Sequence, residues 1–200
     1  MALDKYGTGR DPYCYRDSDV LCNVLNIENS ADLEEAEKAL TALAALQIEL
    51  KPPPYDLDYL KTIHQYLFDD LYEWAGELRA IDLTKGSTRF CNYDRINPEA
   101  NKIFGTLRKA GYYINHERSN LVAAVAELYI ELNMVHPFRE GNGRAQRILF
   151  EHIIINCGFE FDLEGISQRE WVDANIAGVR CNYEPMKELF EHCIGGKFIE

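Results

Sequence analysis

Twelve consecutive residues, from His136 to Arg147, bring together side chains of the types that do chemistry. The stretch reads His-Pro-Phe-Arg-Glu-Gly-Asn-Gly-Arg-Ala-Gln-Arg, so it contains a base, a carboxylate, a glycine-rich turn and two arginines near each other. His136, whose ring titrates near neutral pH, could take a proton from an attacking hydroxyl. Glu140 supplies hard carboxylate oxygens, which Mg²⁺ prefers when it is shared with phosphates. These residue types suit proton transfer beside a bound phosphate.

The turn Gly141-Asn142-Gly143 and the helix expected after it predict an anion site. Two glycines beside Asn142 allow positive φ angles, so that backbone N–H groups turn inward, and the helix N-terminus adds its dipole. Arg144 and Arg147 lie three residues apart in the first turn of that helix, where cations are disfavoured. Residues that stand against a local structural preference, as these two cations do, are typical of a functional site.

Each of these features also has a plainer explanation. A single Gly-Asn-Gly is most often an ordinary turn, a histidine before proline is most often a helix end, and paired arginines usually face solvent. The combination is different, because eight specified positions at about one in twenty each give a chance match on the order of 10⁻¹⁰ per starting position. Phe138 is the exception, and we interpret it as a core side chain that anchors the loop.

Two helices must hold this stretch in place. Before it, apolar residues recur at helical spacing after Ser119, which is predicted to cap the helix; after it, a second and largely buried helix follows. The apolar residues are Leu121, Val125, Leu128, Leu132 and Val135 upstream, and Ile148, Leu149, Ile153, Ile154 and Cys157 downstream. The sequence therefore predicts a helix–loop–helix with His136 at the end of the first helix.

The chain as a whole is acidic and has the size of one domain. It has 200 residues, of which 46% are hydrophobic, and we expect an N-terminal arm over residues 1–29 and a single domain over residues 30–200. A formal net charge of −12 opposes binding to nucleic acid or to an anionic membrane, so neither is expected as a partner. Signal-peptide and Cys-x-x-Cys patterns are absent, and Glu127 and Glu131 interrupt the longest apolar helix. We expect a cytoplasmic protein with reduced thiols.

Two helices are predicted before residue 72. Ser30 is expected to cap the first, which runs to about Leu50 and is ended by the three prolines that follow. The second, from Asp56 to Leu71, carries His64 among its apolar residues. We interpret His64 as a core histidine, because burial favours a neutral, hydrogen-bonded ring.

Residues 78 to 92 break the helical pattern. Two short extended pieces flank Thr84-Lys85-Gly86-Ser87-Thr88, and this predicts a β-hairpin. In a helical chain such a hairpin needs helices to pack on or a partner strand. Two interpretations stay open: an ordinary surface hairpin, or a flap that holds an extended segment of another protein by strand addition.

The rest of the chain is predicted to be helical, so the fold class is all-α with one small hairpin. Helices are expected from Asn97 or Pro98 to Lys109, from Ser167 to Ala177 and from Tyr183 to Cys193. Four side chains here are able to reach a nucleotide base, although core packing is the plainer role for Trp171 and helix capping for Asn182. The four are Trp171, Asn175, Asn182 and Tyr183.

The stretch from His136 to Arg147 resembles, without a gap, the Fic motif His-x-Phe-x-(Asp/Glu)-Gly-Asn-Gly-Arg-x-x-Arg. The segment Tyr72-Glu73-Trp74-Ala75-Gly76 is similar to a second segment of that family. The resemblance implies the Fic fold, a helical bundle with a hairpin flap. It also implies transfer of AMP from ATP to a hydroxyl side chain of a target protein, with release of pyrophosphate. A divergent phosphotransferase branch has lysine at the last glycine of the turn, so Gly143 favours AMP transfer.

The resemblance assigns roles position by position. His136 would be the general base and Glu140 the Mg²⁺ ligand, while the flap would hold the target over the histidine. The phosphate ligands would be Gly141, Asn142 and Gly143 for the α- and β-phosphates, Arg144 for the β-phosphate and Arg147 for the γ-phosphate, and the flap residues would be Thr84, Lys85, Gly86 and Ser87.

The resemblance also implies partners. Free-standing bacterial Fic toxins often act on topoisomerase subunits, and Fic enzymes are commonly silenced by a helix with Ser/Thr-x-x-x-Glu-(Gly/Asn), whose glutamate pairs with the last arginine of the motif, here Arg147. In this chain only Ser30 has a glutamate four residues on, Glu34, and Glu35 follows it. We therefore expect the inhibitory glutamate on a separate small antitoxin.

Two alternatives to AMP transfer remain. The first is another Fic-type transfer of a phosphoryl or nucleotide group, because the motif recognises phosphates and not a particular base. The second is a nucleotide-binding interaction module without turnover, against which the complete set of catalytic positions weighs.

Overall fold

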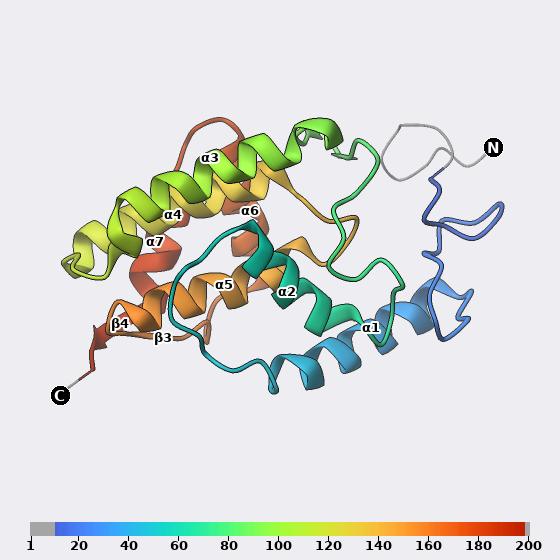
Figure 1. Cartoon of the computed structure of the whole chain (residues 1–200), viewed down its shortest axis with the longest axis horizontal. Helices are drawn as coiled ribbons and strands as arrows, with labels where there is room; N and C mark the ends of the chain where they lie inside the picture. Colours follow the sequence, from blue (N-terminus) through green and yellow to red (C-terminus); the bar gives the residue numbers. More distant parts are fainter. Residues whose placement is uncertain (1–10, 199–200) are drawn as a thin grey trace.

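The computed structural model describes residues 11–198, and α-helices make up about half of the chain (Figure 1). The strands are few and short, which confirms the predicted all-α class. None of the helices between residues 11 and 198 is long and apolar enough to cross a membrane. The helices are α1 Ser30–Ala45, α2 Leu57–Phe68, α3 Ile96–Lys109, α4 Arg118–Val135, α5 Asn142–Asn156, α6 Gln168–Val179 and α7 Glu184–Cys193, and the strands are β1 Thr84–Lys85, β2 Thr88–Arg89, β3 Phe159–Phe161 and β4 Ile194–Lys197.

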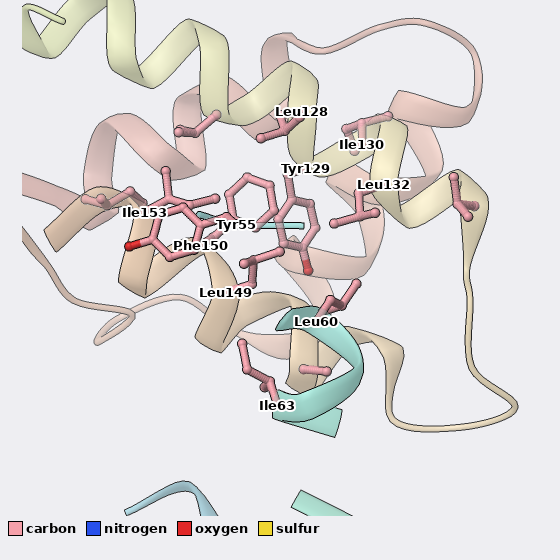
Figure 2. Close-up of a cluster of buried hydrophobic side chains, with 14 of the residues drawn as sticks. Tyr55, Leu60, Ile63, Leu128, Tyr129, Ile130, Leu132, Leu149, Phe150 and Ile153 are labelled. Atoms are coloured by element: carbon pink, nitrogen blue, oxygen red, sulfur yellow. The ribbon is translucent and has the colours of Figure 1, made fainter. Parts of the chain in front are cut away.

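Helices α4 and α5 form the centre of the molecule, as their apolar spacing predicts. Figure 2 shows side chains of α2, α4 and α5 meeting in one buried cluster, with Tyr129 and Phe150 among them. In Figure 1, α3 runs along α4, and α2 lies against α5. Fully burying one such apolar side chain contributes about 1.5–3 kcal/mol, so this cluster fixes the relative positions of the helices that hold the candidate site.

The start and the end of α1 differ from the prediction. Its N-cap is Asn29, not Ser30: the Asn29 Oδ1 accepts hydrogen bonds from the N–H groups of Ala31 (2.8 Å) and Asp32 (3.1 Å). The helix ends at Ala45, well before Leu50 and the prolines. Leu46, the next residue, is 85% exposed, so extending the helix by this residue would bury no further apolar side chain.

Two further predicted helix ends are wrong. Glu117, not Ser119, is the N-cap of α4, and no side chain makes a capping hydrogen bond there. Instead Arg118 fixes the start of α4, because its Nε donates to the carbonyl oxygens of Ile194 (3.0 Å) and Gly195 (3.2 Å). Helix α2 ends at Phe68 and the chain continues as a turn to Leu71.

The predicted hairpin is present as β1 and β2, which pair antiparallel with Thr84 opposite Arg89 and Lys85 opposite Thr88. The turn itself is confined to Gly86, at φ +60°, and Ser87. A second small sheet, β3 paired with β4, was not predicted. Its strands are three and four residues long, and one of them follows α7 directly, so they carry no periodic signal.

The N-terminal segment packs against the loop between α4 and α5. Asp11 forms a buried ion pair with Arg139, whose Nε lies 2.8 Å from the Asp11 Oδ2. Residues 1–10 of the predicted arm lie outside the described residues. The six cysteines are free thiols.

Candidate active site

His136 lies directly after α4 and has a left-handed backbone, with φ +48° and ψ +63°. Its N–H donates to the carbonyl oxygen of Leu132 (3.3 Å), which closes the helix. A left-handed conformation is costly for histidine, and such residues cluster at functional sites. The predicted position of His136 at the helix end is confirmed.

The His136 ring is held on two sides. Its Nδ1 lies 3.2 Å from the carbonyl oxygen of Asn133, and because a carbonyl only accepts, we assign the ring proton to Nδ1. Phe90, which follows β2, stacks on the ring with centroids 3.8 Å apart and planes 13° apart. Burial lowers the pKa of His136 to about 4, so the ring is neutral at pH 7 and Nε2 keeps its lone pair. A general base needs this protonation state.

The loop between α4 and α5 is shaped by one asparagine side chain. The Asn142 Oδ1 accepts from the N–H of Phe138 and its Nδ2 donates to the carbonyl oxygen of Phe138, both over 2.8 Å. Phe138 is fully buried, as predicted, and stacks on His64 at 3.8 Å between ring centroids. Because the Asn142 side chain is used inside the loop, only its backbone N–H is left for an anion.

His64 connects α2 to this loop. Its Nδ1 accepts from the N–H of Gly76 (2.9 Å), and its Nε2 donates to the carbonyl oxygen of Glu140 (3.0 Å). Burial lowers the pKa of His64 to about 4, so both hydrogen bonds are made by a neutral ring. The interpretation of His64 as a core histidine is confirmed.

The two glycines of the turn differ in what they require. Gly141 has φ +77°, and a Cβ there would lie 2.2 Å from the Phe68 ring, so this position accepts only glycine. Gly143 lies inside the first turn of α5, and the nearest atom to a Cβ would be the Arg147 Nη1 at 4.0 Å. The prediction that both glycines are needed for positive φ is therefore wrong for Gly143. Its missing side chain keeps space open at the N-terminus of α5.

The two arginines of the motif have different surroundings. Arg144 forms an ion pair with Glu37 of α1, donates to the Thr41 Oγ1 (3.3 Å) and lies over the Phe68 ring at 4.8 Å. The Arg147 side chain forms no hydrogen bond or ion pair with any residue between 11 and 198. Both arginines line the same cavity, so both are able to meet an anion there.

Glu140 is the one carboxylate of the motif. Its Oε1 accepts from the N–H of Gly141 (2.9 Å), and the residue lines the cavity beside the glycine turn. Within residues 11–198 no cluster of three or more His, Cys, Asp or Glu side chains is arranged to hold a metal. One carboxylate still fits Mg²⁺, which takes one or two carboxylates and completes its coordination with substrate phosphates and water.

One cavity of about 790 Å³ collects the predicted site residues. Its walls are the motif, the flap and α6. Of the predicted flap residues, Lys85 and Gly86 line it, whereas Thr84 and Ser87 do not. The motif residues that line it are His136, Glu140, Gly141, Asn142, Gly143, Arg144 and Arg147.

Helix α6 supplies a further wall of the cavity that the glycine turn lines. Trp171 is buried, as expected, and its Nε1 donates to the Tyr129 hydroxyl (3.0 Å), yet the residue also lines the cavity. The Asn175 Nδ2 donates to the Trp171 carbonyl oxygen (2.8 Å), while the buried Asn175 Oδ1 finds no donor among residues 11–198. A buried acceptor without a partner beside a cavity is a ready contact for a ligand N–H.

Sequence reasoning missed several residues of this site. Glu37 and Phe90 contact motif side chains from 107 and 46 positions away in the chain, and neither has a local signal of that contact. Trp171 and Asn175 were not missed: of the four side chains that the sequence offered for contact with a base, these two line the cavity, whereas Asn182 and Tyr183 do not.

Comparison with known proteins agrees with this geometry. Residues 54–154 match the Fic/DOC family. The chain is 39% identical to the "Probable protein adenylyltransferase Fic" of Escherichia coli (strain K12), over 96% of each chain. The N-terminal Fic domain of a VirB-translocated Bep effector protein from Bartonella quintana, solved with bound ADP, matches with a TM-score of 0.86 and 32% identity, over 92% of this chain and 95% of that one. The BepC protein of Bartonella tribocorum, solved with bound AMPPNP, has the same fold, with a TM-score of 0.89 and 24% identity over 99% and 100% of the two chains.

A helical bundle that gathers a neutral histidine, a carboxylate and a glycine turn at a helix N-terminus around one cavity defines a nucleotide-handling transferase of the Fic class. The chain belongs to the Fic/DOC family, and its relatives from Escherichia coli and Salmonella typhimurium, 39% and 38% identical to it, are both named probable protein adenylyltransferases.

Proposed function

We propose that this chain transfers AMP from ATP to a hydroxyl side chain of a target protein, with His136 as the general base. The observation that carries the proposal is the placement of His136: its ring lines the same cavity as the glycine turn, and the contact of its Nδ1 with the Asn133 carbonyl oxygen (3.2 Å) leaves Nε2 free to accept a proton.

The reaction follows from this arrangement. The target hydroxyl oxygen attacks the α-phosphorus of ATP, the Nε2 of His136 takes the hydroxyl proton, and the bond between the α-phosphorus and the bridging oxygen breaks. The bridging oxygen leaves with the β- and γ-phosphates as pyrophosphate. Because burial holds the His136 pKa near 4, the base needs no prior deprotonation at neutral pH.

The triphosphate is proposed to lie over the N-terminus of α5. At the start of α5 the N–H groups of Asn142 and Gly143 have no hydrogen-bond partner among residues 11–198, so they are available to an anion, whereas the N–H of Arg144 donates to the Gly141 carbonyl oxygen (3.1 Å). Arg144 and Arg147 supply positive charge for the β- and γ-phosphates, and Gly143 leaves the necessary space. When bound at Glu140, Mg²⁺ would neutralise charge on the phosphate oxygens.

The base of the nucleotide is proposed to lie against α6. The partnerless Asn175 Oδ1 accepts a hydrogen bond, which suits the amino group of adenine and not the carbonyl group of guanine at the same position. Trp171 and Ile176 provide apolar surface beside it. This arrangement favours ATP over GTP.

The target is proposed to bind along the flap. β1 and β2 form a two-stranded hairpin, which leaves outer edges able to receive an extended segment, and Lys85 and Gly86 lie at the cavity wall near His136. A topoisomerase subunit is our candidate target by family resemblance.

A separate small antitoxin is proposed to restrain the enzyme through a glutamate that faces Arg147. Two observations support it: Arg147 lacks an ion-pair partner within the described chain, and Glu34, the internal candidate, is exposed on α1. Glu37 of the same helix pairs with the other arginine, Arg144.

Labelled ATP tests the proposed function. The chain is incubated with a lysate and with ATP labelled either at the α- or at the γ-phosphate, with and without Mg²⁺. AMP transfer labels protein only from α-labelled ATP, phosphate transfer labels it only from γ-labelled ATP, and a binding module labels nothing from either. Mass spectrometry of the labelled band then identifies the modified hydroxyl.

A further inference from the structure

Arg79 is a buried arginine between the flap and the end of α4. Arg79 is only 2% exposed, and its side chain forms no ion pair with any acidic side chain of residues 11–198. A buried guanidinium without a carboxylate is costly unless its N–H groups are hydrogen-bonded. The partners of Arg79 therefore indicate why an arginine stands there.

Within residues 11–198, all the hydrogen bonds of the Arg79 side chain go to backbone carbonyl oxygens. The Nε donates to His136 (2.7 Å), Nη1 donates to Ile81, and Nη2 donates to Cys91 and to Val135 (3.2 Å). The backbone N–H of Arg79 donates to the carbonyl oxygen of Pro137 (2.9 Å). One residue thus holds three consecutive carbonyl groups around His136.

The carbonyl groups of Val135 and His136, at the end of α4, need a hydrogen-bond donor from outside the helix. The last carbonyl groups of a helix have no N–H partner within it, and α4 ends at Val135 without a basic residue in its last turn. A guanidinium there satisfies the carbonyl groups and complements the helix dipole. Its planar fork of donors reaches several acceptors at fixed angles, which the single ammonium group of lysine does not.

The carbonyl groups of Ile81 and Cys91, which Arg79 also binds, lie at the two ends of the flap. Ile81 precedes β1 and Cys91 follows β2, so Arg79 ties both ends to the helix that carries His136. The Cys91 N–H adds a hydrogen bond to the Met134 carbonyl oxygen (3.0 Å). Phe90, next to Cys91, is the residue that stacks on the His136 ring.

We propose that Arg79 is a positioning residue that joins the flap and His136 into one rigid unit, so that a target segment added to the flap arrives at a fixed distance from the base. The proposal rests on the proposed function, in which the flap holds the target and His136 takes its proton. Arg79 does not line the cavity and acts on the reaction only through the groups that it holds.

The plainer explanation is that Arg79 only adds stability, and the chain offers a matched control for it. Arg118 also donates to backbone carbonyl oxygens, those of Glu191, Ile194 and Gly195, but at the opposite end of α4, and it differs from Arg79 in forming an ion pair with the Glu191 carboxylate as well. Arg79→Lys and Arg118→Lys each keep the charge and remove a fork of donors. A purely stabilising role predicts similar effects on activity from both.

The expected results separate the two roles. Arg79→Lys lowers kcat for the target by roughly 10- to 100-fold, because a misplacement of about 1 Å can cost 10²-fold in rate. Binding of ATP, measured by calorimetry, stays within about twofold of wild type, because Arg79 does not line the cavity in which the phosphates are proposed to lie. Arg118→Lys lowers the unfolding midpoint and leaves kcat unchanged. Equal kcat losses in the two variants, or none in Arg79→Lys, would overturn the proposal.

A second measurement needs neither a variant nor activity. If the flap and the end of α4 are one unit, native-state hydrogen exchange of the wild-type chain shows the Cys91 and His136 amides opening with the same free energy and the same denaturant dependence. Rapid exchange at Cys91 with His136 still protected would mean that the flap opens alone, and the proposal would be wrong. Since this result does not depend on turnover, it stands even if the chain transfers no AMP.

Discussion

Arg144 and Glu37 form an ion pair between the first arginine of the motif and a carboxylate of α1, 107 residues apart in the chain. The Tyr72 hydroxyl donates to the other Glu37 oxygen (2.5 Å), so the carboxylate is held from two sides. The pair joins α1 to the N-terminal end of α5. Arg147, by contrast, keeps its charge uncompensated within the described residues, so the two motif arginines differ before any ligand binds.

Replacing Glu37 tests that pair. We expect Glu37→Gln to lower the free energy of unfolding by about 1–2 kcal/mol, because a half-buried guanidinium loses its partner. Glu34→Gln is the control, because it removes the same charge at an exposed position of the same helix. Its free energy of unfolding should stay within about 0.5 kcal/mol of wild type. Urea unfolding measures both, and equal values for the two variants would show that the ion pair does not stabilise the fold.

His136→Ala should abolish AMP transfer and leave ATP binding nearly intact, because the base acts on the incoming hydroxyl and not on the nucleotide. Loss of a general base typically costs about 10² to 10⁴ in rate. Single-turnover labelling gives the rate, and calorimetry gives the affinity for ATP. A variant that labels the target at the wild-type rate would show that another group takes the proton.

The pH dependence of transfer should report the burial of His136. The active form is the neutral ring, and its pKa is lowered from 6.5 to about 4. The rate should therefore stay level from pH 8 through 6.5 and fall only as the pH approaches 4, where the ring gains a proton. Phe90→Leu removes the stacked ring, rehydrates the imidazole and should move this acidic limb upward. A wild-type limb centred near pH 6.5 would contradict the assignment.

Gly143→Lys should block the nucleotide without unfolding the chain. A Cβ at this position meets no atom closer than 4.0 Å, so the fold tolerates it, but the side chain fills the space over the α5 N-terminus. Gly105→Lys, on α3 in open space, is the matched control. We expect ATP binding to be lost only in Gly143→Lys, with both unfolding midpoints within a few degrees of wild type. Unchanged AMP transfer in Gly143→Lys would place the phosphates elsewhere.

Co-expression tests the proposed antitoxin. The small reading frame next to this gene should suppress labelling, because its glutamate forms a charge-assisted pair with Arg147. Replacing that glutamate by glycine should restore labelling. If the purified chain alone is inactive and Glu34→Gly activates it, the restraint lies within the chain and the antitoxin proposal is wrong.

The sequence by itself determined the chemistry of the site, because the motif is contiguous. Twelve neighbouring residues specify a helix end, a turn and a helix start through local backbone preferences, and no distant contact is needed to bring His136 near Gly143. The helices of the core were predictable for a similar reason, since their apolar spacing repeats along the chain.

Only the tertiary structure decided which groups surround that motif. The contacts of Arg144 with Glu37, of His136 with Phe90 and of Arg79 with the end of α4 join segments 46 to 107 residues apart, and each depends on how whole helices pack. When one side chain binds another, the sequence can at least be searched for residues of the complementary type. Arg79 binds carbonyl groups, which every residue carries, so no sequence pattern marks its partners.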